Sequence, residues 1–110
     1  MVSVLAVGER RLKAAVLIHA GLSSSRPLPE ADPFNFLPRF RVPTLMGNGR
    51  SDFLLPLETS QRPMFRLLGA PEKDKQQIFW DGGHGDIGAN YKTVVKETLD
   101  WFDRYLGPVK

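Results

Sequence analysis

Two ionisable residues, Asp52 and His84, each lie in a glycine-containing turn that follows a short apolar run. Asp52 follows residues 43–47 and a cluster of turn formers, and His84 follows residues 77–80 within Asp81-Gly82-Gly83-His84-Gly85. An imidazole is the usual general base near neutral pH, and a carboxylate beside it fixes its tautomer and stabilises its charged form. Glycines let a loop turn sharply and present such a ring. The pair therefore indicates proton-transfer chemistry of the kind that activates a serine.

Three short apolar runs predict the strands that must position this pair, at residues 14–18, 43–47 and 77–80. The first, Ala14-Ala15-Val16-Leu17-Ile18, is apolar throughout, which is typical of a strand buried on both faces of a parallel sheet. Pro56 opens a predicted helix from about residue 57 to 68, which Pro63 must kink or split. A repeat at helical spacing predicts an amphipathic final helix, formed by Val95, Leu99, Phe102 and Leu106.

The order strand, excursion, strand, helix, strand, helix predicts an α/β fold with a parallel sheet. The excursion, residues 22–43, is rich in Ser and Pro, and a lid and a plain linker are equally good interpretations of it. Ligands of open parallel sheets bind at the carboxyl ends of the strands. We therefore expect Asp52 and His84 to lie within hydrogen-bond reach. His19, which ends the first run, is either a pocket-lining residue or a strand-end residue without a role.

Two of these turns resemble loops of the α/β-hydrolase superfamily. Gly49-Arg50-Ser51-Asp52, with Pro56 soon after, resembles the acid loop after the seventh strand, and Gly82-Gly83-His84-Gly85 resembles the histidine loop after the eighth. Trp101-Phe102 resembles part of the final helix. The passage into Arg41-Val42-Pro43-Thr44-Leu45 is most similar to the prolyl-oligopeptidase and dienelactone-hydrolase-like branch. The resemblance implies one partial domain over residues 1–110, the C-terminal portion of an α/β-hydrolase, with about three parallel strands and covering helices.

The same resemblance implies a serine hydrolase that cleaves an ester or peptide bond through an acyl-enzyme. His84 would be the general base and then acid, and Asp52 its orienting acid. The nucleophile of the family lies on a G-x-S-x-G turn, and no such motif occurs, because Ser3, Ser23–Ser25, Ser51 and Ser60 all lack the flanking glycines. Met1–Val7 would be the tail of the helix after that turn, so we expect a truncated chain without the nucleophile half. The alternative is a non-catalytic α/β-hydrolase-like binding or structural module.

A rival alignment concerns Leu17-Ile18-His19-Ala20-Gly21, which also resembles the His-Gly loop that builds an oxyanion hole after the third strand. That alignment requires a nucleophile turn between Gly21 and Asp52. The sequence has none there, so the run at residues 14–18 is better interpreted as the sixth strand.

Composition excludes several other classes of protein. Of the 110 residues, 42% are hydrophobic and 25% charged, as in ordinary globular domains, and the lack of cysteine excludes disulfides and cysteine-based zinc sites. The net charge of +3 comes from basic residues interleaved with acids, so we expect neither nucleic acid nor a membrane as a partner. No apolar run reaches the ~20 residues of a bilayer span. The N-terminus lacks the basic leading region of a signal peptide, which favours a cytoplasmic location.

The expected partners follow from the same features. A small-molecule ester or peptide substrate would bind in the intact enzyme, with no cofactor. Asp81 and Asp86 flank His84, but no second histidine lies nearby, so we expect no metal site. The first strand should be an exposed apolar edge, and such edges pair readily. We therefore expect either a missing N-terminal half or self-association at that edge.

Overall fold

Three parallel strands form one sheet in the computed structural model, which describes residues 7–108. The strands are β1 (Ala15–Ile18), β2 (Thr44–Gly49) and β3 (Lys75–Trp80), in the order β1-β2-β3. The longer helices are α2 (Arg62–Leu67) and α3 (Tyr91–Leu106). Short turns complete the chain: a π-helical turn at Leu57–Gln61 and 3-10 turns at Pro33–Asn35, Leu37–Arg39, Glu72–Asp74 and Gly88–Asn90.

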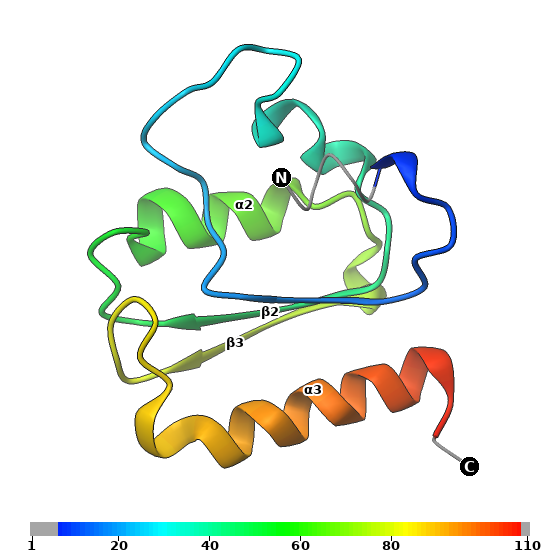
Figure 1. Ribbon diagram of the computed structural model, residues 1–110, viewed down its shortest axis with the longest axis vertical. Coiled ribbons are helices and arrows are strands. Elements are labelled where there is room, and N and C mark those ends of the chain that lie inside the picture. Colours follow the sequence, from blue (N-terminus) through cyan, green and yellow to red (C-terminus); the bar gives the residue numbers. More distant parts are fainter. Residues whose placement is uncertain (1–6, 109–110) are drawn as a thin grey trace.

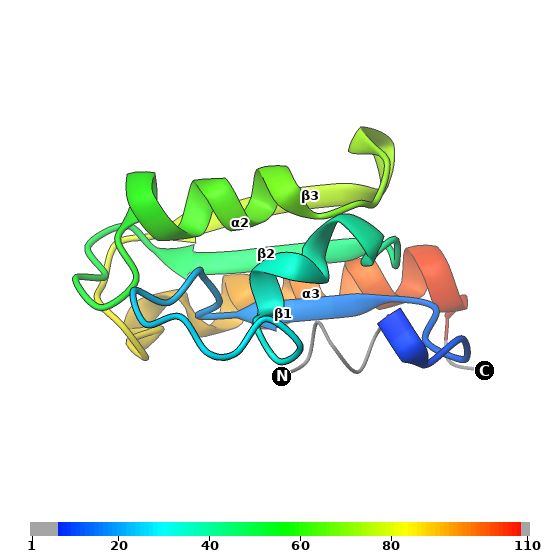
Figure 2. The same cartoon turned by 90° about the horizontal axis from the view of Figure 1, so that it is seen from above.

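The sheet is covered on both faces, by α2 on one side and α3 on the other (Figure 1). Seen from above, β1 lies at one edge of the sheet, as expected (Figure 2). The predicted α/β class with parallel strands is therefore confirmed. No helix within residues 7–108 is long and apolar enough to cross a bilayer. The predicted helix tail at Met1–Val7 falls almost wholly outside the described residues.

The central strand is longer than the sequence predicted. Asn48 and Gly49 look like turn formers, yet both belong to β2, which is buried along its whole length. Asn48 is tolerated there because its side-chain amide donates to the carbonyl of Ala20, 2.7 Å away, so a buried donor has a partner. Strand β3 likewise begins two residues earlier than predicted, at Lys75.

The predicted helix over residues 57–68 forms as two consecutive helical segments of different type, which meet just before Pro63. The π-helical turn Leu57–Gln61 runs into α2, and Pro63 lies in the first turn of α2, where no intrahelical N–H donor is needed. Carbonyls in the last turn of α2 and directly after it accept hydrogen bonds from the buried ammonium group of Lys75, which lies 3.0 Å from the Phe65 oxygen and 3.1 Å from the Leu68 oxygen.

The main core lies between the sheet and α2, and the end of the excursion forms part of it. Leu37 and Phe40 are fully buried, together with Met46 of β2, while residues 23–31 are exposed. Met64 and Leu68 complete this cluster from the side of α2. Residues 37–40 are therefore neither a lid nor a linker, because removing them would expose the core.

Helix α3 meets the sheet through a different face from its apolar repeat. Val94 and Trp101 are buried, whereas Val95, Leu99 and Leu106 are exposed. Residues 94 and 101 form a second apolar row beside the first, so the repeat predicted the helix but not its orientation. The larger indole decides the orientation, because burying Trp101 removes the most apolar surface from water.

Candidate active site

The loops after β2 and β3 lie side by side at the carboxyl ends of these strands (Figure 1). Hydrogen bonds of the sheet continue into them, since the Arg50 N–H donates to the carbonyl of Trp80 at 2.9 Å and the Ser51 N–H to that of Gly82 at 3.0 Å. A side chain at Gly49 would collide with the carbonyl oxygen of Gly82, and its Cβ would lie 2.8 Å from the carbonyl oxygen of Gly83. Only glycine permits this approach, which brings the two loops together.

The side chain of Asp52 is completely buried and uses both of its oxygens. Oδ1 accepts hydrogen bonds from the backbone N–H groups of Leu54 and Leu55, both at 2.9 Å. Oδ2 lies 2.7 Å from Nδ1 of His84. Asp52 thus bonds its own turn and also contacts the histidine, and the expected hydrogen-bond reach between the two residues is confirmed.

Gln61, the last residue of the π-helical turn that precedes α2, holds the acid loop in place. Its buried side-chain amide donates to the carbonyls of Gly49 at 3.0 Å and Leu55 at 2.8 Å, which lie on either side of Asp52. Sequence reasoning missed this residue, because a glutamine within a helical segment gives no signal of burial. The contact fixes the carboxylate through its backbone.

The charge state of Asp52 determines the tautomer of His84. Burial alone would raise the pKa of Asp52, but hydrogen bonds from the Leu55 N–H, the His84 ring and the Leu54 N–H hold that pKa below its usual value. An ionised carboxylate only accepts hydrogen bonds, so Nδ1 of His84 must be the donor. In the neutral ring, Nε2 then keeps its lone pair, and the His84 side chain as a whole is about one-third exposed.

The histidine loop is held on its other side by Trp80. The indole N–H of Trp80 donates to the carbonyl of Asp86 at 2.7 Å, and the Asp86 N–H donates to the carbonyl of Gly83 at 3.3 Å. Gly85 has a φ of 76°, in the left-handed region that favours glycine. The ring of His84 is therefore presented by a loop whose two ends are both fixed.

His19 lies beside His84, although the sequence left its role open. Its ring centroid is 5.6 Å from that of His84 and 5.5 Å from that of Trp80. The rings of His19 and Trp80 meet edge to face. Its backbone has a φ of 57°, which costs a non-glycine residue about 1–3 kcal/mol. The signal in the sequence was its position at the end of the first strand.

No serine hydroxyl within residues 7–108 hydrogen-bonds to His84. Ser60 donates to the carbonyl of Leu22 at 2.6 Å, and Ser23 and Ser25 bond to each other. Ser3 lies outside the described residues. Across the same described part of the chain, no group of three or more His, Asp or Glu side chains is arranged to hold a metal ion.

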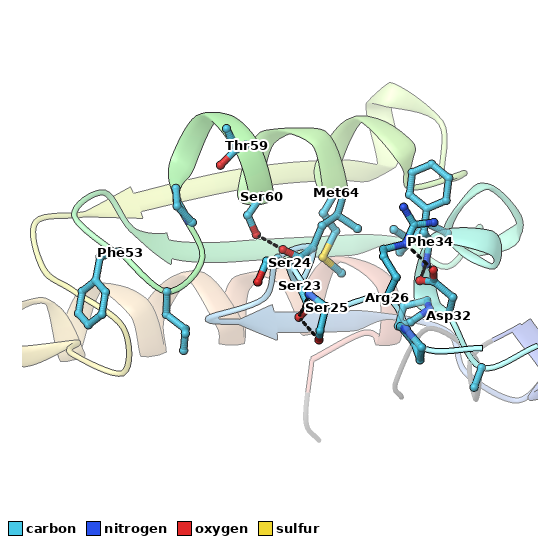
Figure 3. A pocket seen from close by; sticks show the side chains of 18 residues that line it. Ser23, Ser24, Ser25, Arg26, Asp32, Phe34, Phe53, Thr59, Ser60 and Met64 are labelled. Carbon is cyan, nitrogen blue, oxygen red and sulfur yellow. Dashed lines mark hydrogen bonds and ion pairs between the residues drawn. The ribbon is translucent and has the colours of Figure 1, made fainter. Parts of the chain in front are cut away.

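A cavity of about 860 Å³ lies next to the acid loop, between the excursion and α2. Phe53 and Leu54, which directly follow Asp52, both line it. Phe53 lies at one end of the cavity, and Arg26 and Asp32 lie at the other (Figure 3). Arg26 and Asp32 form an ion pair with an N–O distance of 2.8 Å. The cavity is within the size range of small-molecule sites, and its walls are mostly apolar.

Comparison with known proteins gives matches among solved structures alone; no family model and no curated protein matches the chain. Three structures of a cold-adapted esterase from an Arctic intertidal metagenomic library superpose on it. The zinc-bound form has a TM-score of 0.71 and 22% identity over 93% of this chain. The complex with polyethylene glycol and the native form give TM-scores of 0.70 and 0.69, both at 21% identity, over 92% and 93% of this chain.

The fold is α/β-hydrolase-like. The chain spans about 42% of the length of the esterase in its zinc-bound form, so it corresponds to part of that fold. The predicted fold class is thereby confirmed. Identities this low are informative about the fold alone, and the more specific resemblance to the prolyl-oligopeptidase and dienelactone-hydrolase-like branch stays a hypothesis.

Proposed function

We propose that this chain supplies the acid and the histidine of a serine hydrolase, and that a segment outside these residues supplies the nucleophile. The observation that carries the proposal is the 2.7 Å hydrogen bond between Asp52 and His84, made by a buried carboxylate to a half-exposed ring. Structural ion pairs of this kind also occur without catalysis. Here, however, the pair lies at the carboxyl ends of parallel strands, where such sheets bind ligands.

The proposed reaction is hydrolysis of an ester or peptide bond through an acyl-enzyme. Nε2 of His84 takes the proton of the serine as its Oγ attacks the carbonyl carbon. The resulting imidazolium, stabilised by Asp52, gives that proton to the leaving alcohol or amine. A water molecule then loses its proton to His84 and attacks the acyl-enzyme, which releases the acid and returns the proton to the serine.

The cavity beside the acid loop is the proposed substrate pocket. Its mostly apolar walls suit the hydrocarbon part of an ester, and the esterase activity named for the structural neighbour favours an ester over a peptide. We also propose that the chain belongs to the prolyl-oligopeptidase and dienelactone-hydrolase-like branch, and this proposal is supported by the sequence Arg41–Leu45 alone.

A non-catalytic module is the second candidate function. The observation in its favour is that none of the serines of the 110-residue sequence lies in a G-x-S-x-G motif. Such a module would keep the sheet and the Asp52–His84 contact as structural features. It would bind a partner at the carboxyl ends of the strands, where this contact lies.

The DNA directly upstream of the Met1 codon distinguishes the two. An in-frame G-x-S-x-G there, followed by ester hydrolysis by the extended polypeptide, would support the hydrolase. A stop codon and a promoter at that place would support the module. Below, the extended chain means this sequence preceded by the residues that such an upstream reading frame encodes.

A further inference from the structure

A second histidine, His19, contacts the histidine loop through its ring. Nδ1 of His19 accepts a hydrogen bond from the backbone N–H of Gly85, at 3.3 Å. Gly85 is the residue next to His84, so this contact joins the end of β1 to the loop that carries the proposed base. The rest of the ring is fixed by its edge-to-face contact with Trp80.

The backbone of His19 supports a role for this ring. Glycine would adopt the left-handed conformation at this position without strain, yet the chain has an aromatic side chain there. Strained backbone of this kind clusters at functional sites and persists only where its surroundings hold it. At His19 the surroundings are the Gly47 carbonyl, which accepts the His19 N–H at 2.9 Å, and the contacts of the ring with Gly85 and Trp80.

The contact with Gly85 requires a neutral imidazole. A nitrogen that accepts a hydrogen bond must keep its lone pair, and in the imidazolium both ring nitrogens are donors. Protonated His19 would therefore turn an N–H towards the N–H of Gly85 and lose the bond.

We propose that neutral His19 is a positioning residue, which holds the loop carrying His84 through the Gly85 N–H and releases that loop when it becomes protonated. The catalytic consequence rests on the proposed function, because loosening the loop would weaken the alignment of His84 with Asp52. The positioning itself does not depend on catalysis and is measurable in this chain alone.

Within residues 7–108, three charged or titratable groups from two loops influence the charge of His19. They are His84 and Asp86 in the histidine loop, and Asp52 in the acid loop. Burial lowers the pKa of His19, the neighbouring His84 lowers it again, and the two carboxylates raise it in part, so the net pKa lies below the ordinary value. The neutral form is thus favoured in the fold. The contact is present at neutral pH and is lost as pH falls below the ordinary histidine range of about 6.5.

The test is an NMR titration of the isotopically labelled chain from about pH 8 to pH 5, the range in which histidines change charge. It follows the Gly85 amide, the imidazole nitrogens of His19 and the Nδ1 proton of His84. We expect the Gly85 amide shift to follow the protonation of His19, separately from that of His84. Amide exchange at Gly85 should speed up roughly three- to tenfold beyond its intrinsic pH dependence as His19 becomes charged, as loss of one hydrogen bond predicts.

Two variants separate the ring from the backbone. His19→Gly keeps the left-handed backbone and removes the acceptor, so Gly85 should exchange fast at every pH and the His84 Nδ1 proton signal should broaden. His19→Asn tolerates the same backbone and keeps an acceptor oxygen that does not titrate. This variant should restore the protection of the Gly85 amide from exchange, and that protection should no longer change at the pH where wild-type His19 becomes protonated.

An unchanged Gly85 amide and His84 signal in folded His19→Gly would overturn the proposal. If that variant does not fold, a Gly85 midpoint that persists in His19→Asn at the pH where His19 titrates in the wild type, distinct from the titration of His84, would overturn it equally. An extended chain without esterase activity would contradict the proposed function, while the NMR result would still decide the role of His19.

Discussion

Asp52 and His84 lie 32 positions apart in the sequence and are joined by a hydrogen bond of 2.7 Å between Oδ2 and Nδ1. Their meeting is a consequence of the sheet, because Gly49 of β2 pairs with Trp80 of β3 and the next residues continue the ladder into both loops. The geometry of the pair therefore depends on the register of two parallel strands and on the backbone contact at Gly49.

Substitution of Gly49 by Ala should separate the pair. The added methyl group would collide with the carbonyl of Gly82 and crowd that of Gly83, which must move the histidine loop away from Asp52. We expect a loss of about 1–3 kcal/mol in the free energy of unfolding, as for other overpacked sites, and loss of the His84 Nδ1 proton signal. Gly83→Ala is the matched control in the same region, since its nearest contact would be at 3.9 Å. Equal stability and equal spectra for the two variants would show that the close approach is unimportant.

Stability should depend on the ionisation of Asp52. Because the pKa of Asp52 is lowered in the fold, its stabilising contribution is present above the pKa of an unfolded aspartate, near 3.9. That contribution is lost as pH falls through the lower folded value. Denaturant unfolding of the chain and of Asp52→Asn should therefore differ most near neutral pH, and the difference should shrink in acid. A difference that stays constant from neutral pH to about pH 2 would contradict this.

The 110-residue chain alone should be inactive as a serine hydrolase. A base and an acid without a positioned nucleophile cannot form an acyl-enzyme. We expect no labelling by a serine-directed phosphonate probe, and hydrolysis of p-nitrophenyl esters no faster than by free imidazole. Stoichiometric labelling of any serine in this chain would show that a nucleophile is present, with Ser23, Ser24, Ser25, Ser51 and Ser60 as the residues to map.

The outer edge of β1, which pairs with no other strand within residues 7–108, should promote self-association of the isolated chain. The Ala15 and His19 N–H groups donate inward to residues 43 and 47, so the alternation of the strand turns those of Val16 and Ile18 outward. Unpaired edges of this kind bind other strands. Sedimentation should show oligomers that increase with concentration, and Val16→Pro, which removes one outward donor, should reduce them. A monomer at high concentration with a sharp thermal transition would be the contrary result.

Much of the fold was predictable because its signals are local. The structure contains the elements that these local signals predicted. The signals are the apolar runs around Leu17 and Leu45, the prolines at 56 and 63, and the final apolar repeat. The side of α3 that meets the sheet was not predictable, because Val94 and Trp101 form a second apolar row and the choice between rows depends on how much surface the sheet can cover.

The site was predictable to a lesser extent. Asp52 and His84 stood out because glycine-containing turns follow strands, and their contact requires nothing beyond adjacent parallel strands. Asn48, Gln61 and the ring of His19 were missed or left open, because their roles come from single contacts across the fold. A polar residue that finds one buried partner leaves no periodic pattern in the sequence.

The rate of serine acylation in the extended chain tests the central claim most directly. Labelling by the phosphonate probe and ester turnover would be compared for the wild type, His84→Ala, Asp52→Asn and the exposed control Asp100→Asn. We predict that His84→Ala abolishes turnover, that Asp52→Asn lowers it by roughly four orders of magnitude through the wrong tautomer, and that Asp100→Asn leaves it unchanged. Wild-type rates in both His84→Ala and Asp52→Asn, with labelling of the upstream serine retained, would contradict the assignment of this pair as the acid and base of the hydrolase.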